Sequence, residues 1–167
     1  MRYTFNTLVL LFLISSNVYS QTPGKPPAQT IPDFKFFRFN DGPFINKDLP
    51  QGKMLFFIFF DSDCEHCQRA IENIGQYYQS FKNVSICLIS MDDENKISHF
   101  IDTYGRQLKG QRNVTLLRDK LNQFIQKFNP RRYPSMFLYS PGKKLIDYED
   151  NAESVFRLVN AINKAGK

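Results

Sequence analysis

Hydrophobic residues in this chain occur in short runs that alternate with amphipathic segments. Residues 54–60 are apolar without interruption, which predicts a central strand that is covered on both faces. Residues 84–90 form a second, largely apolar run and predict a second buried strand. Before them, residues 34–39 alternate as a strand does, and a turn at 40–43 leads into a short return strand at 44–45.

Apolar residues recur at helical spacing in four segments. Residues 64–81 are predicted to form one helix, and residues 92–104 the next. Residues 121–128 and 155–162 show the same spacing, the latter as the inner face of a terminal helix. The remaining apolar stretches predict strands at 114–117, 136–139 and 145–148, the last two joined by a turn at 140–143. Because strands and helices alternate, the pattern predicts an α/β sandwich.

The N-terminal segment differs from the rest of the chain. Arg2 precedes a short apolar run and Ser20 offers a small residue for cleavage, so residues 1–20 are predicted to be a secretory signal peptide. Residues 21–32 hold four prolines and a glycine and predict an extended, mobile linker, and residues 33–167 are predicted to form the single domain. We therefore expect export to the periplasm, with secretion or an N-terminal membrane anchor as alternatives. The apolar run is shorter than the roughly 20 residues that span a bilayer, which disfavours a retained anchor. No stable membrane insertion is expected once the signal is removed, because no other stretch of the sequence could cross a membrane.

The chain has 22 Lys and Arg against 16 Asp and Glu, a formal net charge of +6. The basic residues are scattered and are not interleaved with aromatics in a stripe, which favours a solvated basic surface and argues against nucleic-acid binding. The aromatic residues lie mostly in the strand-like runs and are assigned to the core. A monomer is expected.

Three cysteines, Cys64, Cys67 and Cys87, offer the most distinctive chemistry. Cys64 and Cys67 have C-x-x-C spacing and lie between a predicted buried strand and a predicted helix. A bridge between them would close a very small loop and constrain the unfolded chain little, so a reactive role is favoured over a structural one. Cys87 lies within a predicted strand and is expected to be a small buried hydrophobe.

Three stretches relate this arrangement to a known fold. They are the Ile-Pro-Asp-Phe opening at 31–34, the run at 53–60 that leads into the cysteines, and the segment at 132–138, where a strand starts at Pro134, followed by a Pro-Gly-Lys turn at 141–143. With the element order, they resemble the thioredoxin fold, and most closely the exported TlpA/ResA-like thiol–disulfide oxidoreductases, over about residues 31–165. The resemblance implies a central mixed β-sheet flanked by helices on both faces, with a cis peptide bond before Pro134 that faces the disulfide.

The two cysteines are expected to play different roles. Unpaired N–H groups and the helix dipole stabilise a thiolate at a helix N-terminus, so Cys64 is predicted to be the attacking thiol. Cys67, one turn further, is predicted to be the resolving thiol, so that the pair forms a redox-active disulfide. Between them, His66 is expected to stabilise a Cys64 thiolate and Glu65 to oppose it, which leaves the direction of electron flow open.

The resemblance also assigns Tyr133 and Pro134 to a groove beside the disulfide, where an extended partner would bind. Protein thiols and disulfides are the expected substrates, with a separate redox protein as donor, and no cofactor or metal is expected. The chain departs from the family in having no Trp and no buried acid, since Ile58 and Ala70 stand at two positions where relatives have one. The proton of the resolving thiol would then go to Glu65 or to water.

Three other interpretations were weighed. A peroxiredoxin has a Pro and a Thr or Ser upstream of its cysteine in P-x-x-x-T-x-x-C order, and Phe57 and Asp61 occupy those places. A periplasmic metal carrier, for copper above all, could bind its ion through Cys64 and Cys67, although a closed zinc site needs four ligands and only two histidines remain. The two intact cysteines argue against a binding module without redox activity.

Overall fold

The computed structural model describes residues 24–166, so the predicted signal peptide at 1–20 lies outside the described residues. Apart from the two helices discussed below, the predicted elements are confirmed to within one to three residues at their ends. The strands are β1 (Lys35–Phe37), β2 (Pro43–Ile45), β3 (Leu55–Phe59), β4 (Ser85–Ser90), β5 (Val114–Arg118), β6 (Ser135–Tyr139) and β7 (Leu145–Glu149). The α-helices are α1 (Glu65–Gln76), α2 (Tyr78–Phe81), α3 (Glu94–Tyr104), α4 (Gln123–Phe128) and α5 (Val155–Ala165), and short 3-10 helices are η1 (Asn46–Asp48) and η2 (Ala152–Ser154).

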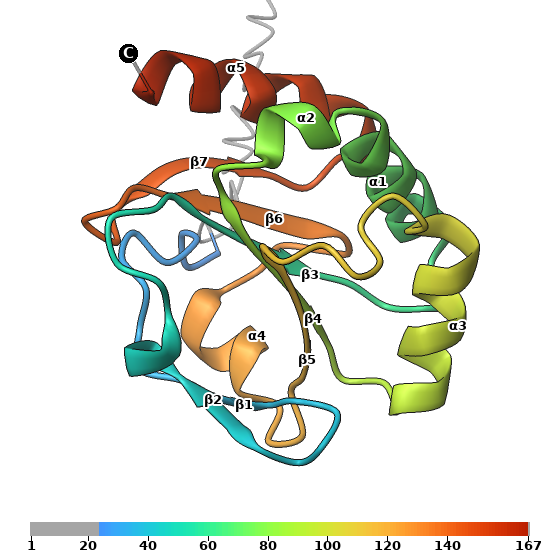
Figure 1. Ribbon diagram of the computed structural model, residues 1–167. Coiled ribbons are helices and arrows are strands. Elements are labelled where there is room, and N and C mark those ends of the chain that lie inside the picture. The colour runs from blue at the N-terminus through green and yellow to red at the C-terminus, as the bar shows by residue number, and fades with distance from the viewer. Residues whose placement is uncertain (1–23, 167) are drawn as a thin grey trace, which may run out of the picture.

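The strands form one seven-stranded sheet in the order β2-β1-β5-β4-β3-β6-β7. The three central strands β3, β4 and β5 are parallel, and the strands on either side of them pair antiparallel. Helices α1, α2, α3 and α5 lie on one side of the sheet and α4 lies on the other (Figure 1). This is the predicted mixed sheet with helices on both faces. Because parallel strands end at the same edge, the loops after β3, β4 and β5 meet there.

Every residue of β3 is buried, as its uninterrupted apolar run predicted. Alternate side chains enter two different layers, because successive residues of a strand point to opposite faces. Phe56 and Ile58 join α1, α2, α3 and α5 in a layer that is mostly aliphatic, here called the aliphatic layer. Phe57 and Phe59 join α4 in what we call the aromatic layer. Its buried aromatic residues are Phe34, Phe36, Phe44, Phe57, Phe59, Phe124, Phe128, Phe137 and Tyr139.

The single helix predicted over 64–81 is wrong, because the structure has two helices there. They are separated at Tyr77, whose backbone (φ −92°, ψ 15°) leaves the helical region. Gly75, just before the break, weakens a helix by about 1 kcal/mol relative to alanine. The break also turns Phe81 back onto the sheet, where its ring stacks on Phe56 with centroids 5.2 Å apart.

Helix α4 is shorter than predicted over 121–128. It begins where the buried Asp119 carboxylate accepts its first two N–H groups, at 3.0 and 2.7 Å, one on each oxygen. Leu121 and Ile125, which the spacing assigned to the helix's apolar face, are 51% and 47% exposed. A helix of this length buries only one side, so two large apolar residues stay at the surface near the ends of the parallel strands.

The Pro-rich segment predicted as a linker over 21–32 is bound to the domain in its described part. Thr30 forms an antiparallel bridge with Lys144, and the Ala28 N–H donates to the Phe128 carbonyl at 2.9 Å. This segment also contributes side chains to the aromatic layer. The domain therefore begins before the predicted boundary.

Candidate active site

The loop that joins β3 to α1 is braced against the end of β4. The Phe60 N–H donates to the Ile89 carbonyl at 3.0 Å, and the Ser62 N–H donates to the Asp92 carboxylate at 2.9 Å. The Ser90 hydroxyl donates to the same carboxylate at 3.1 Å. Burial opposes ionisation of Asp92, but the hydrogen bonds from Ser62 and Ser90 outweigh it and hold the pKa of Asp92 below its ordinary value. Asp92 therefore holds the loop as a carboxylate.

Cys64 is the N-cap residue of α1, and Cys67 lies in the first turn of the helix. The Cys64 carbonyl accepts the N–H groups of Cys67 at 2.9 Å and Gln68 at 3.1 Å, so the helix starts directly after Cys64. Cys64 is half-buried and Cys67 is fully buried, and both are free thiols. The structure thus places an accessible sulfur at the helix N-terminus and a buried one about a turn later.

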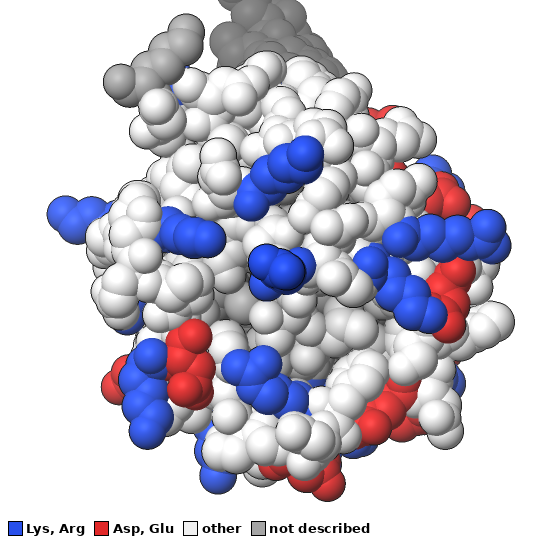
Figure 2. Space-filling model, viewed as in Figure 1, with Lys and Arg blue, Asp and Glu red and all other residues white. Residues whose placement is uncertain are grey.

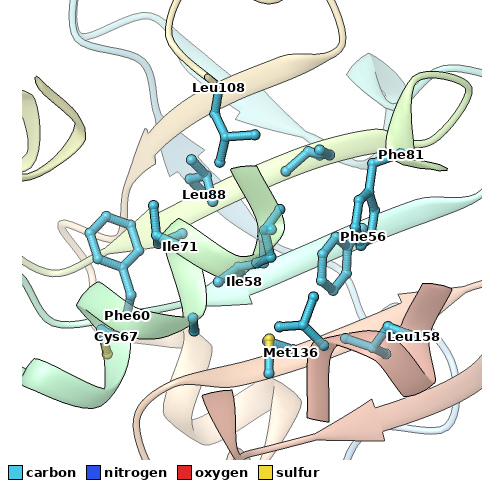
Figure 3. Close-up of a cluster of buried hydrophobic side chains, with 14 of the residues drawn as sticks. Phe56, Ile58, Phe60, Cys67, Ile71, Phe81, Leu88, Leu108, Met136 and Leu158 are labelled. Carbon is cyan, nitrogen blue, oxygen red and sulfur yellow. The ribbon is translucent and has the colours of Figure 1, made fainter. Parts of the chain in front are cut away.

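Cys67 belongs to the aliphatic layer (Figure 3). Burial raises the pKa of the Cys67 thiol well above its ordinary value, because an apolar surrounding disfavours the thiolate. A hydrogen bond to the Cys64 sulfur and the negative charges of Cys64 and Asp61 raise it further, while a main-chain hydrogen bond from Asp61 opposes them. Cys67 is therefore held as a thiol.

The two residues between the cysteines are both exposed. Glu65 lies in the first turn of α1, where a negative charge favours the helix through its dipole. His66 Nδ1 lies 2.7 Å from Nη2 of Arg69, one turn further along, so the guanidinium donates to the ring. The opposing effects of Glu65 and His66 on the Cys64 sulfur stay predictions.

The peptide bond between Tyr133 and Pro134 is cis, as the resemblance implied. Pro134 is buried and Tyr133 is half-buried. Below them, the hydroxyls of Ser135 and Tyr148 lie 2.8 Å apart and hydrogen-bond to each other. Burial raises the pKa of Tyr133 to about 12, and the charges of nearby acids and of Cys67 add to this effect. Tyr133 and Cys64 both pack against the aliphatic layer to which Cys67 belongs.

An aromatic stack connects α4 to this loop. The ring centroids of Phe128 and Phe124 are 4.3 Å apart, those of Phe124 and Phe59 are 4.3 Å apart, and those of Phe59 and Tyr133 are 4.9 Å apart. Such pairs add about 0.5–1.5 kcal/mol each beyond the burial of their area. Sequence reasoning missed this stack, because it joins Phe59 of β3 to residues 124–133, a segment far along the chain.

Two hollows flank Tyr133. The one on the α4 side, here called the apolar hollow, is lined by Phe59, Ile125, Pro130, Arg131, Arg132 and Tyr133. The other, here called the polar hollow, is lined by His66, Arg132, Tyr133, Asp150 and Asn151. Arg132 pairs with Asp150 at 3.8 Å, whereas Arg131 forms no ion pair with any residue of the described chain. The guanidinium of Arg131 lies 5.3 Å from the ring of Tyr148.

The positions that lack a buried acid are confirmed as apolar. Ile58 and Ala70 are fully buried in the aliphatic layer. The charge of Asp61 makes a small further contribution to the raised pKa of Cys67. Cys87 is buried in the aromatic layer as expected, and burial raises its pKa to about 12.

Three features beyond the two hollows are the surface charge, the hydrophobicity of the helices and the side chains that could bind a metal ion. On the face shown in Figure 2, uncharged surface separates most Lys and Arg side chains, and acidic side chains accompany them at the margins. Among the helices of residues 24–166, none has the length and apolarity to cross a membrane. In that same part of the chain, His, Cys, Asp and Glu side chains form no group of three or more that could hold a metal ion.

Comparison with known proteins places this geometry in a wider group. A model of the AhpC/TSA family matches residues 27–148. A secreted Mycobacterium tuberculosis disulfide oxidoreductase homologous to E. coli DsbE is 20% identical, covers 78% of this chain and 95% of its own, and gives a TM-score of 0.62. Peroxidoxin BcpB from Mycobacterium tuberculosis is 15% identical, with 83% and 96% coverage and a TM-score of 0.67. DsbF of the same organism is 20% identical, with 83% and 99% coverage and a TM-score of 0.63.

No curated protein matches the sequence. At these identities the solved structures establish the thioredoxin-like fold and no more, which confirms the predicted fold class. The family model, by contrast, spans most of the described chain and includes the cysteine pair and Pro134. The protein therefore belongs to the AhpC/TSA family of thioredoxin-like redox proteins.

Proposed function

We propose that the protein is a thiol–disulfide oxidoreductase of the TlpA/ResA-like kind that exchanges dithiol for disulfide with exported proteins at Cys64-Glu65-His66-Cys67. The observation that supports this best is the pairing of a half-exposed thiol at the start of α1 with a buried thiol about one turn later. Exchange needs such a pair, because the outer sulfur must meet a partner and the inner one must reach only the outer.

The first step is attack by the Cys64 thiolate on one sulfur of a substrate disulfide. Cys64 is the N-cap residue of α1, so the unpaired N–H groups of the helix start lie beside it. A bond forms between Cys64 and the attacked sulfur, the substrate disulfide breaks, and the other substrate sulfur leaves and takes a proton.

The second step releases the substrate. Cys67 loses its proton and attacks the Cys64 sulfur, so the Cys64–Cys67 bond forms while the mixed disulfide breaks. The substrate leaves with two thiols, reduced by two electrons, and the protein holds the disulfide. A separate redox protein would restore the dithiol, and the same steps in reverse would oxidise a substrate dithiol.

The surface around Tyr133 suits an extended protein segment. The apolar hollow exposes Ile125 beside the ring of Tyr133, and Arg131 at its margin lacks an acidic partner in the described chain. A segment with a large apolar side chain and a neighbouring carboxylate would fit both features. Substrates in the periplasm or outside the cell are proposed from the signal-like residues 1–20.

Peroxide reduction is the second candidate, favoured by the family match and by the likeness to peroxidoxin BcpB. In that reaction the Cys64 thiolate would attack the peroxide O–O bond, giving a sulfenic acid and an alcohol or water, and Cys67 would condense with it and release water. Against it, Asp61 stands where a peroxiredoxin has a hydroxyl. A carboxylate accepts hydrogen bonds and donates none, so it cannot hold the peroxide oxygen in the same way.

Two assays on the protein without its first 20 residues separate the candidates. We expect catalysed reduction of insulin disulfides by the dithiol form, and consumption of hydrogen peroxide no faster than by an ordinary exposed thiol. Equilibration with glutathione redox buffers then gives the reduction potential of the Cys64–Cys67 couple and with it the favoured direction. Rapid peroxide turnover without disulfide exchange would overturn the proposal in favour of the peroxidase.

A further inference from the structure

A basic residue lies shortly before each of the three parallel strands. Lys53 precedes β3, Lys82 precedes β4 and Arg112 precedes β5, in each case by two or three residues. Because these strands are parallel and pair from their first residues onward, they begin at the same edge of the sheet. The topology therefore collects three positive charges at this edge, which is opposite the edge that carries the cysteine pair.

The three side chains line one hollow in the surface, here called the basic hollow. It has a volume of about 520 Å³, and its other lining residues are Tyr78, Gly110, Gln111 and Asn113. All three bases are exposed, and no Asp or Glu lines the hollow. Near the centre of the face in Figure 2, which carries α2 and the start of β4, Lys and Arg side chains occur while Asp and Glu lie toward the margins.

No acidic side chain neutralises these bases within residues 24–166. The ion pairs in that part of the chain use other cations, namely Lys96, Lys109, Arg118, Lys120, Arg132 and Arg157. Like charges around a single hollow focus a positive potential and raise the local concentration of anions. A bound anion would also relieve the repulsion between the three bases.

Hydrogen bonds within the chain fix the inner residues of the basic hollow. The Asn113 amide donates to the carbonyls of Phe81 and Val84, at 2.9 and 2.8 Å. The Tyr78 hydroxyl donates toward the side-chain oxygens of Asn113 and Gln111, at 2.7 and 3.0 Å. Because these bonds join α2, the start of β4 and the loop before β5, the hollow needs little rearrangement to bind a ligand.

A phosphate group is the anion that these features suit. Its oxygens accept charge-assisted hydrogen bonds from ammonium and guanidinium groups, and the volume leaves room for the alcohol that carries the phosphate. We propose that Lys53, Lys82 and Arg112 bind a phosphate group, carried by a soluble phosphate ester or by a phospholipid headgroup. This site is separate from the cysteine pair and does not depend on the exchange reaction proposed above.

Calorimetric titration of the purified protein with inorganic phosphate at low ionic strength tests the site. We expect saturable binding of a single phosphate per chain. Lys53→Gln and Lys82→Gln each remove a charge-assisted hydrogen bond and should weaken binding about tenfold. The matched control is Lys47→Gln, which removes an exposed lysine that is outside the hollow and likewise has no ion pair in the described chain. It should change the dissociation constant by less than about twofold.

Two results would overturn the inference. The first is the absence of saturable phosphate binding by the wild-type protein. The second is an equal loss of affinity in Lys47→Gln, which would show a response to net charge alone. All three variants alter exposed side chains and should unfold at the wild-type temperature in phosphate-free buffer, so a loss of affinity is not a loss of fold.

Vesicles of phosphatidylglycerol, compared with vesicles of phosphatidylcholine, identify the source of the phosphate. If a lipid headgroup is the ligand, Lys53→Gln and Lys82→Gln should each reduce cosedimentation with phosphatidylglycerol about fivefold, and Lys47→Gln should not. If a soluble ester is the ligand, glycerol 3-phosphate should bind at least as tightly as inorganic phosphate, and the two lysine variants should match wild type on vesicles. Vesicle binding that is equal in all variants, without binding of either soluble phosphate, would reject the site.

Discussion

The start of α1 and the middle of β4 place the same side chain in opposite surroundings. Cys64 is half-buried at a helix N-terminus and touches Cys67, whereas Cys87 is fully buried in a central strand between the facing residues Phe57 and Thr115. Burial raises the pKa of both Cys67 and Cys87. Cys67 nevertheless lies about one helical turn from a second, half-buried sulfur, whereas Cys87 faces Phe57 and Thr115 on the neighbouring strands.

The difference shows that burial alone does not decide whether a thiol is reactive. A buried thiol becomes useful when an exposed partner sulfur can bring the reaction to it and a base can take its proton. The variants below test that contrast at each position in turn.

The largest effect is expected from Cys64→Ser. A serine hydroxyl does not form a comparable nucleophile, so disulfide exchange should fall by at least about a thousandfold. Insulin reduction and release of a coloured thiolate from a chromogenic aromatic disulfide, bis(nitrobenzoate) disulfide, are the measurements, and circular dichroism should show an unchanged fold. Attack by Cys64 releases one coloured thiolate from this probe, and resolution by Cys67 releases a second. Exchange at wild-type rate in this variant would contradict the assigned attacking role.

Cys67→Ser should separate the two chemical steps. The first coloured thiolate should still be released, because Cys64 is intact, while the second should be lost and the mixed disulfide should accumulate. Mass spectrometry of the trapped adduct at Cys64 gives the readout. Release of both thiolates in this variant would show that solvent thiols, and not Cys67, resolve the intermediate.

Features that depend on local pattern were predictable from the sequence. The uninterrupted run of β3 predicted burial on both faces, and the spacing of Cys64 and Cys67 predicted an outer and an inner sulfur at a helix start. The cis bond before Pro134 followed from the resemblance alone.

Features that depend on packing between distant segments were not predictable. The break at Tyr77 is favoured by the stacking of Phe81 on Phe56, and helical spacing contains no information about that contact. The aromatic stack that joins Phe59 to Tyr133 and to α4 likewise depends on contacts between β3 and a segment far along the chain.

A smaller effect is expected at the substrate surface from Arg131→Glu. The guanidinium borders the apolar hollow without an ion-pair partner in the described chain, so reversing its charge should slow exchange with an acidic peptide disulfide by about tenfold at low salt. A neutral peptide should react at nearly the wild-type rate. Arg112→Glu, just before the start of β5 and not part of the apolar hollow, is the matched control. An equal loss of exchange rate in that variant would indicate a general charge effect with no role for the apolar hollow.

The smallest effect on exchange, and the clearest contrast with the pair, is expected from Cys87→Ala. Exchange should be unchanged, while loss of a buried sulfur should lower the free energy of unfolding by about 1–2 kcal/mol near neutral pH. Burial raises the pKa of Cys87 from 9.0 to about 12, so the folded protein keeps a proton that the unfolded chain loses. The contribution of the Cys87 thiol to the free energy of unfolding of the wild-type protein is therefore fully present below about pH 9. Above that pH it falls by about 1.4 kcal/mol per pH unit.

Because the alanine variant lacks this thiol, the difference in stability between the two proteins should shrink with rising pH and vanish between about pH 9.7 and pH 10.5. Urea unfolding followed by circular dichroism measures it. Ile89→Val shortens a side chain in the same strand and layer and should lower the free energy of unfolding by a similar amount, about 0.5–1.5 kcal/mol. This substitution removes no titrating group, so it serves as the control. Its deficit should therefore stay constant with pH. If the deficit of Cys87→Ala stayed equally constant, or if exchange were lost with it, Cys87 could not be the inert counterpart of the pair on α1.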